Sequence, residues 1–247
     1  MHHIFIGFFI SIGLAVVFSV GLFVRAYEPS SAPKLLNTGT PRILTVGWDK
    51  GTAAYALVSA VKGKTEIIPV DNKTGYEFNL SNGLLVVSRD GQTVWRSPAD
   101  WWVASFVVAD VNHDSKMELN LSVWKPGDYG PSKPAWVEKN DMSIKNHLFV
   151  YELAADGVHS LWQSSNLDQP SCEFIFADLD GDGKQELGVI EGEYTTTKTC
   201  RGKFMAIWKW DEWGFYNQWR SNAGHFSDLH AVLAGGETYL ESNLIID

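Results

Sequence analysis

The sequence predicts an all-β domain, a small β-propeller of about four blades, which follows a single N-terminal transmembrane helix. Acidic loops between apolar strands begin at Asp110 and at Asp178, 68 residues apart, and a second kind of hairpin occurs in three places. An uncharged N-terminal stretch predicts the helix. The expected organisation is a membrane anchor over residues 1–25, a linker over 26–41 and the propeller over 42–247.

The anchor is predicted from residues 4–24, which contain no charged side chain. At about 1.5 Å per residue, a helix of this length crosses about 30 Å of hydrocarbon. A cleavable signal peptide is the alternative, but its apolar region would be shorter, and no small-x-small cleavage site follows.

Arg25 and Lys34 follow the apolar stretch, so the positive-inside rule would place the domain in the cytoplasm. Calcium is abundant outside cells, however, and long domains translocate with little regard to flanking charge. We therefore expect a single-pass membrane protein with an extracytoplasmic globular domain.

Three hairpins share one pattern: an apolar strand, a turn with Asp or Gly, and a strand that ends in Trp-Arg-Ser or Trp-Gln-Ser. They cover residues 84–97, 147–164 and 203–221. Trp95, Trp162 and Trp219 are therefore equivalent positions. We expect these large rings to pack between neighbouring blades.

An acidic loop with a calcium-binding pattern runs from residue 178 to residue 186. Its candidate metal-ligating residues are Asp178, Asp180, Asp182, Lys184 and Glu186. Carboxylates this close repel one another unless a hard cation lies among them, and Ca²⁺ takes six to eight oxygens at about 2.3–2.6 Å. Gly183 would allow the left-handed backbone that such a turn needs. Apolar strands flank the loop, and Val189 stands where a helix–loop–helix site has its glutamate. The pattern predicts a calcium loop inside a β-hairpin.

A second copy of the loop runs from residue 110 to residue 118. Its candidate metal-ligating residues are Asp110, Asn112, Asp114, Lys116 and Glu118. Asn112 replaces an acid and Ser115 replaces the turn glycine, so we expect this copy to bind Ca²⁺ more weakly. A solvated acidic turn without metal is the alternative for each loop.

These two loops and the strands around them resemble the FG-GAP/VCBS repeats, whose loops follow the pattern Asp-x-Asp/Asn-x-Asp-Gly-x-x-Asp/Glu-Leu. The resemblance implies a β-propeller of four-stranded blades, with Ca²⁺ in the first hairpin of a blade. The ends of the chain admit two arrangements. Residues 42–48 with 53–60 lead into the first blade, or residues 42–60 complete a fourth blade and close the ring by pairing with the C-terminal stretch 229–242.

Composition bounds the partners. The net charge is −9 and no basic cluster occurs, which argues against nucleic-acid binding. Cys172 and Cys200 fall in one predicted blade, at strand starts on the same end of the sheet. A disulfide there would suit an oxidising compartment, and two free thiols are the alternative.

The functional expectation is a membrane-anchored, calcium-binding module for binding, adhesion or scaffolding at the cell surface, without catalysis. No zinc-protease motif, nucleophile elbow or phosphate loop occurs. The long connection 124–146 is the candidate recognition surface, where Tyr129 and Trp136 would stack on a glycan or a surface protein, or else fold back as a cap. Alternatives are a polysaccharide lyase or glycosidase that uses Asp128 or Glu193, and an accessory subunit of a membrane complex.

Overall fold

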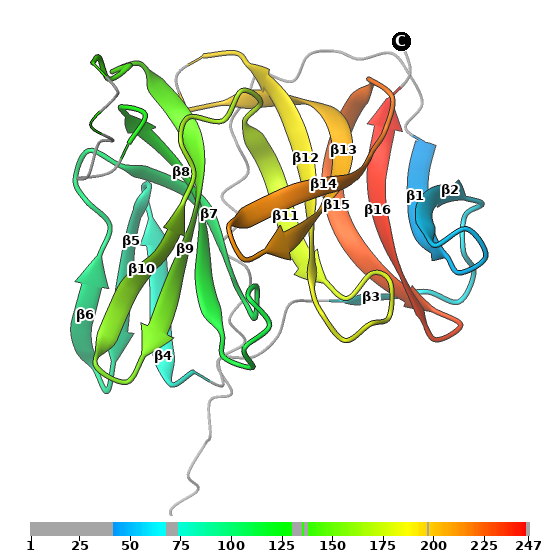
Figure 1. Cartoon of the computed structure of the whole chain (residues 1–247), viewed down its shortest axis with the longest axis horizontal. Coiled ribbons are helices and arrows are strands. Elements are labelled where there is room, and N and C mark those ends of the chain that lie inside the picture. The colour runs from blue at the N-terminus through cyan, green and yellow to red at the C-terminus, as the bar shows by residue number, and fades with distance from the viewer. Residues whose placement is uncertain (1–41, 68–73, 130–134, 136–137, 197, 246–247) are drawn as a thin grey trace, which may run out of the picture.

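The computed structural model describes residues 42–67, 74–129, 135, 138–196 and 198–245. These ranges form four antiparallel sheets and no helix, so the predicted all-β class is confirmed (Figure 1). In this part of the chain, nothing helical is long and apolar enough to cross a membrane. The predicted anchor over residues 1–25 and the linker over 26–41 lie outside the described residues.

We number the sheets I to IV. Sheet I contains β4 (Tyr76–Ser81), β5 (Leu84–Arg89) and β6 (Gln92–Arg96). Sheet II contains β7 (Trp102–Ala109), β8 (Glu118–Pro126), β9 (Ile144–Ala154) and β10 (Gly157–Gln163). Sheet III contains β11 (Ser171–Ala177), β12 (Glu186–Tyr194), β13 (Cys200–Asp211) and β14 (Gly214–Arg220). Sheet IV has the order β2-β1-β16-β15-β3, with β1 (Arg42–Asp49), β2 (Ala54–Val58), β3 (Thr65–Ile67), β15 (His225–Ala234) and β16 (Glu237–Ile245).

The four sheets stand side by side in the order I to IV, from the β4–β6 end to the β1–β2 end of the molecule (Figure 1). The described residues form three buried apolar clusters, one between each pair of neighbours in this row. Strand β4 shows why sheet I ends the row. Its alternating side chains bury Tyr76 and pack Phe78 against sheet II, whereas Glu77 and Asn79 face away and are exposed. Burial of apolar surface between sheets therefore holds the row together.

The equivalent tryptophans pack between sheets as predicted. The Trp95 ring of sheet I lies 5.3 Å from the Tyr151 ring of sheet II, measured between centroids. Trp162 of sheet II lies 6.0 Å from Trp210 of sheet III, and Trp219 packs into the cluster between sheets III and IV. One large ring per hairpin thus joins each sheet to the next.

The two ends of the described chain meet in sheet IV. Strand β1 pairs with β16 in antiparallel register, with Arg42 opposite Leu244 and Val46 opposite Leu240. The expected pairing of residues 42–60 with the C-terminal stretch is therefore confirmed, and the alternative that they lead into the first unit is wrong. The ring closure expected with this pairing is not seen among the described residues, because the pairing joins strands within sheet IV and does not bring sheet IV to sheet I. Val46 faces the cluster beside sheet III, so β1 buries its apolar face there rather than against sheet I.

The described sheets form an open row. Sheets I and IV lie at its opposite ends, and none of the three buried clusters of the described residues joins them. Sheet I contains only three of the described strands. Strand β3, which precedes β4 in the chain, pairs with β15 at the edge of sheet IV instead of joining sheet I. The hairpin pattern did not anticipate either β3 or β4.

Candidate metal centres and the cavities between sheets

The loop between β11 and β12 is folded by hydrogen bonds from its own backbone. The carboxylate of Asp178 accepts from the backbone N–H of Gly181 at 2.8 Å and of Gly183 at 3.0 Å. Both glycines are left-handed, with φ of 79° and 84°, as predicted for Gly183. Glu186 accepts from the backbone N–H of Leu179 at 2.8 Å. These bonds turn the acidic side chains toward the inside of the loop.

The loop between β7 and β8 has the same scaffold. Asp110 accepts from the backbone N–H of Asp114 at 3.1 Å and of Ser115 at 2.9 Å. Ser115 adopts the left-handed backbone, with φ of 68°, at a cost of about 1–2 kcal/mol for a residue with a Cβ. Glu118 accepts from the backbone N–H of Val111 at 2.8 Å. Ser115 therefore keeps the left-handed turn that Gly183 makes in the other loop, at a higher conformational cost.

Each loop brings three carboxylates together, with ligand atoms all within 4.8 Å of one another, so both clusters could hold a metal ion. The clusters consist of Asp110, Asp114 and Glu118, and of Asp178, Asp180 and Glu186. The other predicted ligands support the turns: the backbone N–H groups of Lys116 and Lys184 donate to Asp114 and Asp182, and Asn112 accepts from the N–H of Asp114.

The glutamate of each cluster is buried. Glu118 is 0 % exposed and Glu186 is 1 % exposed. Burial is the main cause that raises the pKa of each glutamate, and the charges of Asp110 and Asp180, respectively, act in the same direction, so that each pKa lies at about 7. Glu118 Oε1 has no hydrogen-bond partner among the described residues. A buried, unpartnered carboxylate oxygen beside two further carboxylates is an environment that a bound cation relieves.

Lys209 distinguishes the second cluster from the first. Its Nζ lies 2.5 Å from Asp180 Oδ2, 3.3 Å from Glu186 Oε1 and 3.4 Å from Asp182 Oδ2. Burial would lower the pKa of Lys209, but the hydrogen bond to Asp180 and the charges of Glu186 and Asp180 raise it above its ordinary value. An ammonium group therefore already lies among these carboxylates.

The first cluster has an acid where the second has this lysine. Tyr151 pairs with Leu119 and Trp208 pairs with Leu187, so Glu152 and Lys209 are equivalent positions on β9 and β13. The two clusters thus share a backbone scaffold and differ in charge. Sequence reasoning missed both residues because they lie on other strands than the loops.

A tyrosine from sheet IV also reaches the second cluster. Tyr55 on β2 is buried, 6 % exposed. Burial raises its pKa, and the charges of Glu186 and Asp180 raise it further. The second loop therefore lies against the strand pair that the N-terminal end of the domain supplies.

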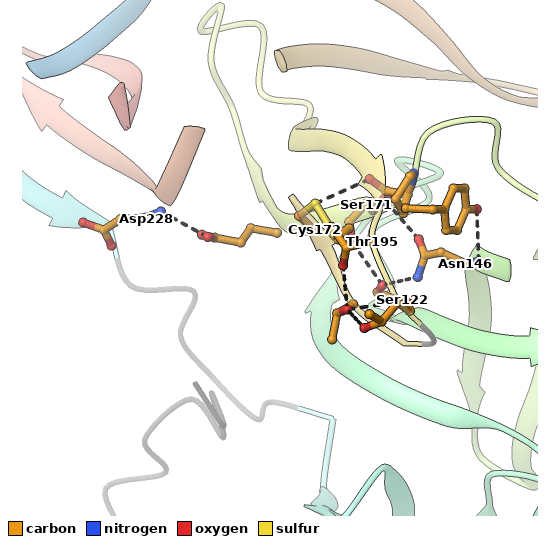
Figure 2. Close-up of a disulfide and its surroundings, with 12 residues drawn as sticks. Ser122, Asn146, Ser171, Cys172, Thr195 and Asp228 are labelled. Carbon is orange, nitrogen blue, oxygen red and sulfur yellow. Dashed lines mark hydrogen bonds between the residues drawn. A yellow bond between two sulfur atoms is a disulfide. The ribbon is translucent and has the colours of Figure 1, made fainter. Parts of the chain in front are cut away.

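The predicted disulfide is present. Cys172 at the start of β11 is bonded to Cys200 at the start of β13, with their Cα atoms 5.8 Å apart (Figure 2). Gly192 packs directly against the disulfide. A Cβ at this position would come within 2.4 Å of Cys172 Sγ, so a larger residue would not fit without a shift. Figure 2 also shows Asn146 between two sheets, where it accepts from the N–H of Ser171 at 2.9 Å and donates to Ser122 at 2.9 Å.

Among the described residues, cavities open between neighbouring sheets, and two of them contain predicted site residues. The larger, about 600 Å³, lies between sheets I and II and is lined in part by Asp128 and Tyr129. The other, about 510 Å³, lies between sheets III and IV and is lined in part by Glu193 and Arg201. The two acids considered for glycan cleavage thus lie in different cavities. Trp136, the other predicted recognition residue, lies outside the described residues.

Strand residues at the ends of the two long connections, which follow the acidic-loop hairpins, are in contact. The rings of Trp124 and Tyr194 make an edge contact with centroids 5.6 Å apart, and the Tyr194 hydroxyl accepts from the backbone N–H of Asn146 at 3.2 Å.

Comparison of the chain with protein-family models, with curated proteins and with solved structures finds no match. The function must therefore be argued from the geometry.

Proposed function

We propose that this chain is a calcium-stabilised recognition module of the β-propeller type, related to the FG-GAP/VCBS repeats, which binds other molecules without transforming them. The observation that carries the calcium part is the buried Glu118, whose Oε1 has no partner within a cluster of three carboxylates. Four antiparallel sheets with equivalent tryptophans between neighbours support blade-like units of the propeller type, which the described residues arrange in an open row.

The donor chemistry favours calcium over softer metals. Each cluster consists of carboxylates on a turn with left-handed backbone, and hard oxygen ligands of this kind suit Ca²⁺. The ion would be structural, because it removes the mutual repulsion of acids that the hairpin holds together. Ligand binding to the folded state alone stabilises it, by about 2.7 kcal/mol at a free ion concentration of about 100 times Kd.

Thermal unfolding of the full chain tests this proposal. Ca²⁺ should raise the melting temperature over that in a chelator, and a variant with both Glu118→Gln and Glu186→Gln should lose most of the increase. Glu237→Gln is a matched control, because Glu237 opens β16 as the other two open β8 and β12, yet it is 47 % exposed and paired with Lys50. A melting temperature that is the same in Ca²⁺ and in chelator would refute the calcium role.

We further propose that the module is anchored by residues 1–25 and displayed outside the cytoplasm. The disulfide between Cys172 and Cys200 supports an oxidising location. Protease added to intact cells should remove the domain, whereas protection until the membrane is permeabilised would contradict this orientation.

The separation of Asp128 and Glu193 into two cavities supports binding over glycan cleavage, since a glycosidase needs two carboxyl groups at one bond.

A further inference from the structure

We propose that the cavity between sheets I and II is a binding site for a neutral saccharide. This inference rests on the recognition role proposed above and gives it a ligand class. The cavity measures about 600 Å³, within the range of about 300–1,000 Å³ of ligand pockets. It lies between the outer strands β6 and β10, and the connection that follows β8 forms part of its wall.

Aromatic side chains supply the apolar walls. The cavity is lined by Trp95, Trp101, Tyr129 and Tyr151. Three of these rings are held by other rings: Trp95 packs on Tyr151, and Trp101 packs on Phe149 with centroids 5.0 Å apart. Aromatic faces of this kind cover the C–H faces of a sugar ring, and the packing of Trp95, Tyr151 and Trp101 sets their positions before any ligand arrives.

The polar groups of the cavity favour an uncharged ligand with many hydroxyl groups. Arg96 and Asp128 contribute one positive and one negative charge, so the lining has no net charge for an ionic ligand to match. Gln163 donates to the Tyr151 hydroxyl at 2.9 Å and leaves its own carbonyl as an acceptor. Three serine residues, Ser160, Ser164 and Ser165, also line the cavity.

The wall that carries Asp128 and Tyr129 is built from buried groups. Lys125 is 4 % exposed, and its Nζ donates to the carbonyl oxygens of Gly127 at 2.5 Å and of Tyr129 at 3.3 Å, on either side of Asp128. The backbone N–H of Asp128 donates to Asn140 Oδ1 at 2.6 Å. The Asp128 carboxylate also accepts from the backbone N–H of Asp141 at 3.0 Å, through Oδ2, so both lining residues are held at a defined place in this wall.

The opposite wall is supported by His147, a positioning residue. His147 Nδ1 donates to the backbone carbonyl of Ser164 at 3.2 Å, and the Ser164 hydroxyl accepts from the N–H of Leu148 at 3.0 Å. Burial lowers the pKa of His147 to about 4, so it supports this wall without adding charge near neutral pH. Both walls therefore present polar groups that are held by buried partners.

Binding of saccharides to the full chain tests the proposal. Immobilised neutral, anionic and cationic oligosaccharides would be screened in Ca²⁺, and neutral binders would then be measured by calorimetry at up to millimolar concentrations. Tyr129→Ala should weaken binding about 3- to 10-fold through the lost stacking, and Tyr129→Phe should restore it. Asp128→Asn should weaken it about 10-fold through lost charge-assisted hydrogen bonds. Tyr216→Ala is the control, because Tyr216 is an exposed tyrosine on sheet III, outside the cavity.

The outcomes separate this inference from the proposed function. Calcium-dependent stability with no neutral saccharide bound, or with only charged saccharides bound, would overturn the saccharide site and leave the calcium role standing. Equal binding by wild type, Tyr129→Ala and Asp128→Asn would also overturn it. Saccharide binding that depends on these residues in a protein indifferent to Ca²⁺ would support the site and refute the metal proposal.

Discussion

Replacing Lys209 by methionine should tighten Ca²⁺ binding at the second loop. A divalent ion that enters this cluster must displace an ammonium group that lies 2.5 Å from Asp180 and 3.3 Å from Glu186. Two unit charges about 4 Å apart interact by about 4 kcal/mol at an effective dielectric constant near 20. The Lys209 side chain is 20 % exposed, so solvent screening reduces this value. We take about 1.4–2.8 kcal/mol, which corresponds to a 10- to 100-fold lower Kd.

Calorimetric titration of single-loop variants measures this effect. Glu118→Gln silences the first loop, so that the Kd with and without Lys209→Met belongs to the second loop alone. In the complementary background, Glu186→Gln, the matched change is Lys116→Met, because Lys116 lies 3.5 Å from Asp114 on the exposed side of the first loop. That control should change the Kd far less.

The same reasoning reverses the ranking expected from the loop sequences. Because Glu152 occupies the position equivalent to Lys209, the first loop should fill at lower Ca²⁺ concentration than the second, despite Asn112 and Ser115. Glu152→Lys should then weaken the first loop. An unchanged or higher Kd in Lys209→Met would show that the lysine does not compete with the ion, and the reasoning from its position would be wrong.

Two further predictions concern the buried glutamates of the acidic loops and the disulfide. The pKa of Glu118 and of Glu186 is raised from 4.5 to about 7 in the folded protein. Between pH 4.5 and about 7 the folded state therefore binds more protons than the unfolded state. As a result, the metal-free protein loses stability as the pH rises through this range. The increase in melting temperature caused by Ca²⁺ should therefore be larger at pH 8 than at pH 5; an equal increase at both would contradict the raised values. Cys172→Ala combined with Cys200→Ala opens a cross-link between residues 28 positions apart and should lower the free energy of unfolding in denaturant by about 3–4 kcal/mol. A loss below about 1 kcal/mol would show that the cross-link constrains the unfolded chain little.

Local patterns predicted the features that neighbouring residues control. The turn at residues 178–186 needed only its own backbone and carboxylates, so alternating acids and Gly183 were enough to identify it. The strands that end in Trp95 and Trp162 were found in the same way, because period-two alternation and turn residues act over a few positions. The pairing of residues 42–60 with the C-terminal stretch was one of two arrangements that the pattern allowed.

Long-range pairing controls the rest, because a strand contributes to a site through its register with distant strands. The order of residues around Lys209 says nothing about loop 178–186, and only the pairing of β13 with β12 brings its ammonium to Asp180. Tyr55 reaches Glu186 only because β1 and β2 join the C-terminal sheet. The amino-acid order alone thus specified two acidic turns and the β-hairpins that carry them. Their unequal charge, the open row of sheets and the cavity beside Tyr129 depend on how side chains far apart in the chain come within a few ångströms, where electrostatic and packing energies act.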